Sequence, residues 1–189
     1  MLGHKAREPR QRARGVILVG FMGAGKSSVG RALAEQLGWT FEDLDDRIER
    51  REGCKIPEIF RESGEVGFRR AEHTALKELM GELQAAPEKI VALGGGAFVQ
   101  KENARLVEAG AVSTVFLDAG VDELWRRCRQ QAEQEGTGRP LRGNWERFGE
   151  LYEARRRHYL KASFRQETGG KTIQEIATEV IAALGLERR

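Results

Sequence analysis

The feature that most constrains this chain is a glycine-rich segment of eight residues that lies between an apolar run and an amphipathic stretch. It reads Gly20-Phe-Met-Gly-Ala-Gly-Lys-Ser27 and matches the pattern Gly-x-x-x-x-Gly-Lys-Ser/Thr at every fixed position. In such a segment the glycines let successive backbone N–H groups turn toward phosphate oxygens, and the N-terminus of the following helix adds positive potential. The sequence therefore predicts a nucleotide phosphate site formed by Gly23, Ala24, Gly25, Lys26, Ser27 and Ser28.

Two side chains of this segment carry defined chemistry. Lys26 is placed to reach the β and γ phosphates of a nucleotide, and the hydroxyl of Ser27 is placed to ligate Mg²⁺. A phosphate site alone does not say what happens to the phosphate. A GTPase also needs a guanine-reading Asn-Lys-x-Asp sequence, which the chain lacks. The acceptor of the phosphate therefore has to be inferred from other residues.

Carboxylates near the predicted strand ends are candidates for the metal and the acceptor. P-loop ATPases use an aspartate that ends an apolar strand, but the third predicted strand here ends in Gly94-Gly95-Gly96. Asp118 ends the fourth strand, and we interpret it as a turn acid. Asp43 and Asp45 follow the second strand, where alternate side chains share one face at the carboxyl edge of the sheet. One can hold magnesium-bound water while the other orients a substrate hydroxyl, or the pair could merely cap the next helix.

Short apolar runs alternate with amphipathic stretches along the chain. The predicted strands cover residues 15–20, 41–44, 89–93 and 112–117. The predicted helices cover residues 29–37, 57–60, 65–83, 122–131, 145–159 and 172–184, and the last begins with a capping box of Thr172 and Glu175. Strands that alternate with helices predict an α/β fold with a parallel sheet covered on both sides. A polar, glycine-bearing stretch at about residues 130–144 is predicted to be a mobile lid.

The basic charge of the chain is concentrated at its N-terminus. Residues 1–14 contain five basic residues and one acid, a net charge of +4, whereas the whole chain carries +3, so the remainder sums to −1. We therefore predict a basic, disordered extension at residues 1–14 and a single domain at residues 15–189. A weak contact of the extension with a polyanion is the alternative. No apolar run approaches the roughly 20 residues of a membrane-spanning helix.

Cysteine, histidine and tryptophan give no sign of a further site. Cys54 and Cys128 form no Cys-x-x-Cys pair and have no histidine at ligand spacing, which predicts reduced thiols in a cytoplasmic protein. The three histidines lack the spacing of a triad or a metal site and are expected at the surface. Trp125 and Trp145 are expected to be core residues or to pack between helices.

Six motifs, in order along residues 16–184, resemble the shikimate kinase family. They are Gly20-Phe-Met-Gly-Ala-Gly-Lys-Ser27, Asp43-Leu-Asp45, Ile56-Pro-Glu-Ile-Phe60, Phe68-Arg69 with Glu72, Leu93-Gly-Gly-Gly96 and Arg139-Pro-Leu141. The resemblance implies an α/β fold of P-loop kinase type, a three-layer α/β/α sandwich with a five-stranded parallel sheet and a mobile lid. It also implies ATP-dependent phosphorylation of shikimate to shikimate 3-phosphate with release of ADP, a step of aromatic amino-acid biosynthesis.

The resemblance further implies a role for each residue on the acceptor side. Asp45 binds ring hydroxyls and assists deprotonation, Arg69 pairs with the shikimate carboxylate, and the backbone of Gly94-Gly95-Gly96 packs against the ring. A second arginine near residue 155 also pairs with the carboxylate. Where the family often has Arg-x-Pro-Leu-Tyr, this chain has Arg155-Arg-Arg-His-Tyr159. Spacing to the tyrosine favours Arg155, and Arg156 stays open as the alternative.

On the donor side, the resemblance implies that Asp43 joins Ser27 at Mg²⁺. Arg139, on the lid, contacts the phosphates together with Lys26 and completes the site on closure, and Arg127 stacks on adenine. ATP and shikimate are the expected partners of a monomeric protein, without nucleic acid or membrane. Two alternatives stay open: a gluconate-type or nucleoside-monophosphate kinase on the same scaffold, and a catalytically silent nucleotide-binding module.

Overall fold

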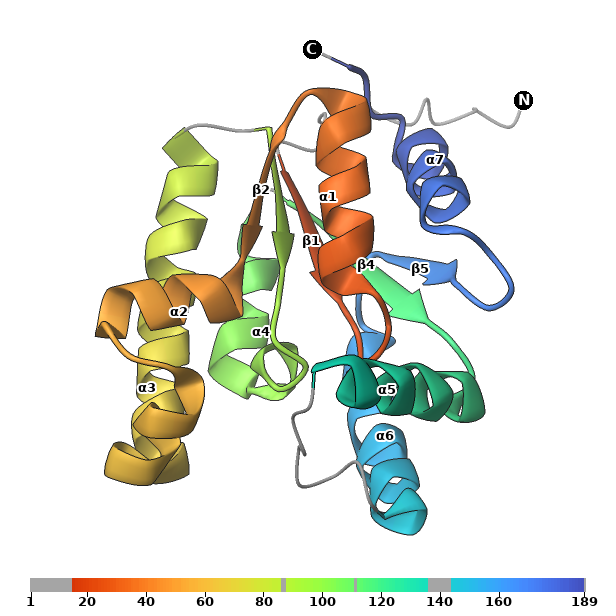
Figure 1. Ribbon diagram of the computed structural model, residues 1–189. Helices are drawn as coiled ribbons and strands as arrows, with labels where there is room; N and C mark the ends of the chain where they lie inside the picture. The colour runs from red at the N-terminus through yellow and green to blue at the C-terminus, as the bar shows by residue number, and fades with distance from the viewer. Residues whose placement is uncertain (1–14, 86–87, 111, 136–143, 189) are drawn as a thin grey trace, which may run out of the picture.

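Five parallel strands form one sheet with the order β2-β3-β1-β4-β5 (Figure 1). They are β1 (Gly15–Val19), β2 (Thr40–Asp43), β3 (Lys89–Ala92), β4 (Ser113–Asp118) and β5 (Phe164–Glu167). The computed structural model describes residues 15–85, 88–110, 112–135 and 144–188. The predicted five-stranded parallel sheet is confirmed. Because all strands point the same way, their carboxyl ends meet at one edge of the sheet.

The strand β1 lies at the centre of the sheet and is buried along its whole length. Its Leu18 is in register with Ala92 of β3 on one side and with Val115 of β4 on the other. A continuous apolar run is what a strand covered on both faces requires. The glycine-rich segment that follows β1 therefore leaves the sheet in the middle of the carboxyl edge, between the ends of its two neighbours.

Helices cover both faces of the sheet and complete the predicted three-layer sandwich. They are α1 (Lys26–Leu37), α2 (Leu44–Glu52), α3 (Ile56–Ala85), α4 (Lys101–Glu108), α5 (Val121–Glu135), α6 (Trp145–Tyr159) and α7 (Ile173–Leu184), with a short 3-10 helix, η1 (Ala97–Val99). α1 and α7 pack together on one face, whereas α3 packs against α4 on the other (Figure 1). α5 and α6 lie beside each other near the carboxyl edge.

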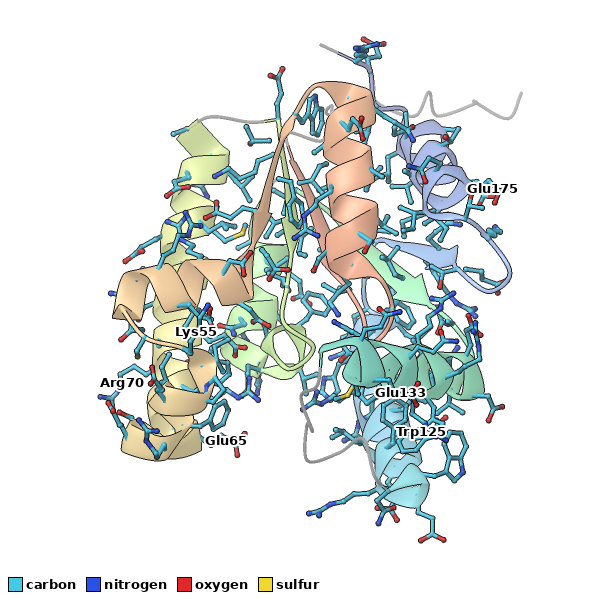
Figure 2. All side chains as sticks on the ribbon, viewed as in Figure 1. Lys55, Glu65, Arg70, Trp125, Glu133 and Glu175 are labelled. Carbon is cyan, nitrogen blue, oxygen red and sulfur yellow. The ribbon has the colours of Figure 1, made fainter. Side chains whose placement is uncertain are left out.

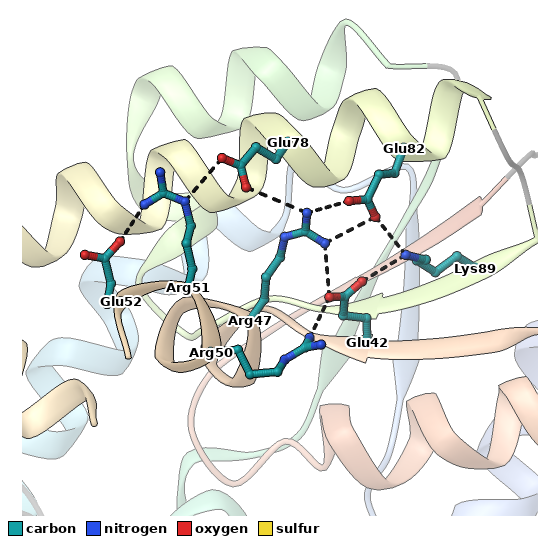
Figure 3. A network of polar contacts seen from close by, with 8 residues as sticks. All are labelled: Glu42, Arg47, Arg50, Arg51, Glu52, Glu78, Glu82 and Lys89. Atoms are coloured by element: carbon teal, nitrogen blue, oxygen red, sulfur yellow. Dashed lines mark hydrogen bonds and ion pairs between the residues drawn. The ribbon is translucent and has the colours of Figure 1, made fainter. Parts of the chain in front are cut away.

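A network of ion pairs fastens α2 to β2, β3 and α3 (Figure 3). Arg47 of α2 reaches Glu42 of β2 and Glu82 of α3, and Lys89 of β3 reaches the same two acids. This outer network continues along the surface through Arg50, Arg51, Glu52 and Glu78. Since Glu42 directly precedes Asp43, the outer network holds the end of β2 and the start of α2 in place.

Several elements differ from the sequence prediction, whose helix ranges contain neither α2 nor α4. α3 spans both predicted helices, which lie on either side of a break at Gly64, where φ is 65° and ψ is −171°. The helix predicted to end at residue 131 continues to Glu135 as α5, because residues 130–135 contain only glutamine, alanine and glutamate, and the lid itself stays a prediction. β5 was not located, since only Gln166 of its four residues is buried and no apolar run marks it.

The structure tests several of the expectations for single side chains. Trp125 (Figure 2) packs edge to face against Trp145 between α5 and α6, with ring centroids 5.6 Å apart. No disulfide joins Cys54 to Cys128. The surface position expected for His73 is wrong, because its half-buried Nδ1 lies 2.7 Å from an Asn103 oxygen. Over the described part of the chain, no helix is long and apolar enough to cross a membrane. The predicted extension, residues 1–14, lies outside the described residues.

Candidate active site

The segment at residues 20–27 forms a tight loop between β1 and α1, hereafter the phosphate loop. Gly23 and Gly25 have φ of 79° and 82°, in the left-handed region that residues with a Cβ disfavour. A Cβ on Gly23 would also lie 2.8 Å from the carbonyl oxygen of Leu124 and 2.9 Å from Sγ of Cys128, both on α5. Gly25 is the N-cap of α1 and offers no capping side chain, so the first N–H groups of the helix remain available to an anion.

The side chain of Lys26 folds back over the phosphate loop. Its ammonium donates hydrogen bonds to the carbonyl oxygens of Gly20 and Phe21, each at 3.0 Å. Burial lowers the pKa of this ammonium, and the negative charges of Asp45 and Asp43 act in the opposite direction. The cation therefore lies in a weakly solvated position, within electrostatic reach of both predicted carboxylates.

Asp43 connects the phosphate loop with α2. Its Oδ2 accepts a hydrogen bond from the hydroxyl of Ser27 at 2.6 Å, and its Oδ1 accepts one from the backbone N–H of Asp45 at 3.0 Å. The second bond makes Asp43 the N-cap of α2, as one of the two interpretations of the sequence predicts. The hydrogen bond with Ser27 places Oδ2 of Asp43 beside the hydroxyl that is the predicted magnesium ligand.

The oxygens of Ser27 and Asp43 suit Mg²⁺. This ion is bound in proteins through one or two carboxylates, while substrate phosphates and water complete its shell. Among the described residues, no group of three or more histidine, cysteine, aspartate or glutamate side chains could form an all-protein metal site. The donor set therefore fits a magnesium ion that arrives with a nucleotide.

A cleft of about 860 Å³ runs along the phosphate loop. All six residues predicted from the loop motif line it: Gly23, Ala24, Gly25, Lys26, Ser27 and Ser28. Its other walls include Asp45 of α2 and Arg127 of α5. The guanidinium of Arg127 is held by Glu123 at 2.8 Å and donates to the carbonyl oxygen of Thr168 at 3.1 Å. The predicted adenine-side arginine is thus fixed across the cleft from the aspartates.

The far wall of this cleft contains residues 171–174, which the sequence interpretation did not include among the site residues. They follow β5 and lead into α7. Because loops after parallel strands meet at the carboxyl edge, recognition of β5 would have pointed to them. The polar composition of β5 removed that signal.

A second cavity, of about 910 Å³, lies along β2 and α2. Arg31, Phe41, Glu49 and Lys55 are among its lining residues, and the phosphate loop does not border it. Its charged groups are largely paired with each other, as Lys55 is with Glu49 at 2.6 Å. The smaller cleft, which contains the phosphate loop, is therefore the candidate active site.

The turn Gly94-Gly95-Gly96 after β3 leaves room for charged side chains. A Cβ on Gly94 would lie 2.6 Å from Oδ1 of Asp45, and a Cβ on Gly96 would lie 2.7 Å from Nη1 of Arg69. None of the three glycines has a positive φ, so the nearby side chains rather than the backbone conformation favour glycine at positions 94 and 96. The structure thereby brings Asp45 and Arg69 together at a turn beside the phosphate loop.

Arg69 is held in place by Glu72, three residues later on α3. Its Nη1 donates to both carboxylate oxygens of Glu72 at 3.0 Å, and its guanidinium lies 5.1 Å from the ring centroid of Phe68. Glu72 is 1% exposed; burial raises its pKa, and the charge of Arg69 opposes this. Sequence reasoning gave Glu72 no role of its own, although the i,i+3 spacing on a helix is the signal for such a pair.

Two adjacent arginines of α6 lie in different environments. Nη1 of Arg155 is 3.7 Å from the position of a Cβ on Gly95, and its guanidinium is 5.9 Å from the ring centroid of Phe21 in the phosphate loop. Arg156 instead donates to Oδ2 of Asp118 at 3.0 Å. Asp118 is 4% exposed, which agrees with its interpretation as a structural acid. The geometry therefore brings Arg155, and not Arg156, to the candidate site.

Fold and site together define a P-loop kinase. A parallel sheet presents a phosphate loop with its lysine and serine, and carboxylates and the guanidinium of Arg127 line the same cleft. Arg139, the predicted lid residue, lies outside the described residues, and its role stays a prediction.

Comparisons with known proteins narrow this class. The family model for shikimate kinase matches residues 22–185. The shikimate kinase of Persephonella marina is 39% identical over 173 residues, which cover 90% of this chain and 99% of that relative. That of Caulobacter vibrioides is 43% identical over 173 residues, covering 90% of this chain and 81% of the relative. The chain belongs to the shikimate kinase family.

Solved structures agree with this assignment. The shikimate kinase from Acinetobacter baumannii in complex with shikimate has a TM-score of 0.80 and 32% identity, and the match covers 93% of this chain and 97% of that one. A gluconokinase from Sinorhizobium meliloti matches with a TM-score of 0.58 and 22% identity over 93% of this chain and 94% of that chain. The second match shows a shared fold alone.

Proposed function

We propose that this protein transfers the γ-phosphoryl group of ATP to the 3-hydroxyl of shikimate and releases shikimate 3-phosphate and ADP. The observation that carries the proposal is the turn Gly94-Gly95-Gly96, around which Asp45, Arg69 and Arg155 gather beside the phosphate loop. Shikimate is a small carboxylate with several hydroxyls on a ring. A site for it needs guanidinium groups at one end and carboxylate acceptors at the other. Membership of the shikimate kinase family supports the same substrate.

In this proposal Arg69 and Arg155 hold the carboxylate of shikimate. A planar guanidinium offers two parallel N–H donors, which match the two oxygens of a carboxylate. Glu72 already fixes one edge of the Arg69 guanidinium, so little side-chain entropy is lost when the substrate binds. The glycines of the turn let the ring approach the backbone closely.

Asp45 and Lys26 act at the reacting atoms. Asp45 accepts a hydrogen bond from the acceptor hydroxyl, orients it toward the γ-phosphate and assists the loss of its proton. Lys26 exchanges its carbonyl partners for the oxygens of the transferring group and stabilises their charge. Mg²⁺, which Ser27 and Asp43 would hold, supplies further positive charge at the β and γ phosphates. Catalysis then rests on positioning and charge stabilisation.

Two further arginines and the setting of the reaction complete the proposal. Arg127 stacks on the adenine base, since it lines the cleft opposite the aspartates. Arg139 contacts the phosphates when the lid closes. The reaction belongs to aromatic amino-acid biosynthesis in the cytoplasm, and the protein acts as a monomer without nucleic acid or membrane.

The test is a coupled assay of ADP formation with a panel of acceptors: shikimate, gluconate and a nucleoside monophosphate. We expect ADP formation that depends on shikimate and on Mg²⁺, with phosphate on the 3-hydroxyl by ³¹P–¹H NMR of the product. ATP consumption that is equally fast without an acceptor, or that responds only to gluconate or the nucleotide, contradicts the proposal.

A further inference from the structure

A buried tyrosine at the end of α6 reaches the turn that organises the acceptor side. Tyr159 is 0% exposed, and its ring packs against Phe116 of β4 with centroids 5.4 Å apart. A phenol buried this deeply needs a partner for its hydroxyl. The hydroxyl of Tyr159 donates a hydrogen bond to the carbonyl oxygen of Gly95, the middle residue of the turn.

Gly95 lies between the phosphate loop and the acceptor side. A Cβ at this position would lie 3.7 Å from Nη1 of Arg155 and 3.7 Å from the backbone nitrogen of Met22 in the phosphate loop. The carbonyl that Tyr159 holds therefore belongs to a residue between the donor side and an acceptor-side arginine.

Arg155 lies one helical turn before Tyr159 on α6, and its positive charge acts on the same hydroxyl. A phenol can donate to one partner while its lone pairs face another. Burial raises the pKa of Tyr159 to about 12, although the charge of Arg155 acts against it. The hydroxyl thus stays protonated at neutral pH and keeps its donor bond to the Gly95 carbonyl.

We propose that Tyr159 is a positioning residue whose hydroxyl sets the Gly95 carbonyl and the Arg155 guanidinium in fixed relation to the phosphate loop. Tyr159 touches no substrate in this arrangement. It acts through Arg155, which holds the carboxylate of the acceptor, and through the turn against which the ring packs. The inference rests on the proposed function and adds to it a residue that aligns the acceptor with the donor.

The experiment compares Tyr159→Phe with Tyr152→Phe. Both tyrosines are buried on α6, but the hydroxyl of Tyr152 donates to Asp118 and Ala119, away from the turn. We expect Tyr159→Phe to raise KM for shikimate about tenfold, the equivalent of one lost hydrogen bond at a charged partner, with KM for ATP changed by less than about twofold. Tyr152→Phe is expected to lower the unfolding temperature and leave KM for shikimate unchanged.

The pH dependence separates positioning from proton transfer. Because the hydroxyl remains protonated well above neutral pH, kcat/KM of Tyr159→Phe is expected to keep the shape of the wild-type profile between about pH 6 and 9. A titration lost in the variant overturns the positioning role and makes the hydroxyl a proton carrier. Equal changes of KM for shikimate in both variants, or none in Tyr159→Phe, also overturn it.

Failure of this inference and failure of the proposed function give different results. If wild-type protein forms no ADP in response to shikimate, the proposed function and the inference that rests on it are both overturned. If wild-type protein is active and Tyr159→Phe has the wild-type KM for shikimate, only the role of Tyr159 is overturned. Unfolding temperatures of both variants exclude loss of folded protein as the cause of a changed KM.

Discussion

The phosphate loop and the acceptor side meet at one cleft but are built in opposite ways. The phosphate loop is one continuous segment, residues 20–27, which can bind an anion through backbone N–H groups and one lysine. The acceptor side consists of Asp45, Arg69, the turn at residues 94–96 and Arg155, which come from four separate elements. The first depends on backbone conformation, and the second depends on side chains that the parallel sheet brings to its carboxyl edge.

This difference has a kinetic consequence. Damage to the phosphate loop should reduce the rate of phosphoryl transfer and leave shikimate binding intact. Damage to the acceptor side should appear in KM for shikimate and leave KM for ATP intact. A variant of either part that changes both the rate of phosphoryl transfer and KM for shikimate would show that the phosphate loop and the acceptor side do not act separately.

The largest effect is expected for Lys26→Ala. Lys26 is the cation of the phosphate loop, and its loss removes charge stabilisation where the transferring group carries its charge. We expect kcat to fall by about 10²–10³-fold, the range for one preorganised donor. Stopped assays of ADP measure the rate, and isothermal titration of shikimate measures the acceptor side of the same variant. Loss of shikimate binding in Lys26→Ala would mean that the lysine also organises the acceptor.

The next effect separates the two arginines of α6. Arg155→Ala removes a guanidinium from the acceptor side, and we expect KM for shikimate to rise by about 10- to 100-fold without a change in stability. Arg156→Ala removes a partner from buried Asp118, and we expect a free energy of unfolding lower by about 1–3 kcal/mol with KM unchanged. Steady-state kinetics of both variants measure KM for shikimate, and urea denaturation measures their free energies of unfolding. The reverse pattern would place Arg156 at the substrate.

A smaller effect is expected when a side chain fills the space beside the turn at residues 94–96. In Gly96→Ala the new Cβ would meet the end of the Arg69 side chain at 2.7 Å, so the guanidinium moves while the fold is kept. We expect KM for shikimate to rise about tenfold, equivalent to about 1.4 kcal/mol, with an unchanged unfolding temperature. Gly149→Ala in α6 is the matched control, since a Cβ there meets nothing within 4 Å. If Gly149→Ala raises KM for shikimate by the same factor, the effect of Gly96→Ala is not due to its contact with Arg69.

The phosphate loop is continuous in sequence and the acceptor side is not. This difference also explains which features could be predicted from the sequence. The phosphate loop was predicted because each of its requirements is written in consecutive residues. Apolar periodicity predicted four of the strands and most of the helices, although not α2 or α4, and Thr172 and Glu175 alone predicted the α7 capping box. β5 was missed because an exposed edge strand of polar residues has no apolar run. The end of α5 differs from the prediction because the glycines that follow it favour a loop, whereas residues 130–135 favour a helix.

For the acceptor side, the sequence identified candidate residues but did not show how they lie relative to one another. Asp43 and Asp45 could be placed at the sheet edge because they follow a strand. Arg155 and Arg156 are adjacent on one helix, and only the tertiary contacts of Gly95 and Asp118 separate them. The buried partner of Arg69 was also missed, because charge on a helix surface is usually solvated and only burial makes Glu72 exceptional.

The smallest effect concerns the outer network, which holds α2 from the side away from the cleft. Hydrogen bonding from Arg47 is the main reason that the pKa of Glu82 falls to about 2. A carboxylate with a depressed pKa stabilises the fold above its ordinary pKa, and this contribution is lost as the pH falls toward 2. The Glu82 side chain is 46% exposed, so screening keeps the contribution below about 1 kcal/mol.

Glu82→Gln should therefore be slightly less stable than the wild type at pH 7, and the two should converge as the pH falls toward 2. Urea denaturation across this range measures the difference, and Glu153→Gln, exposed on α6, serves as the control. KM for shikimate should not change, because Arg47 keeps its bond to Glu42 when Glu82 is neutral. A raised KM for shikimate in Glu82→Gln would make the outer network part of the acceptor side, since the charge on α3 would then be needed to place Asp45 at the cleft.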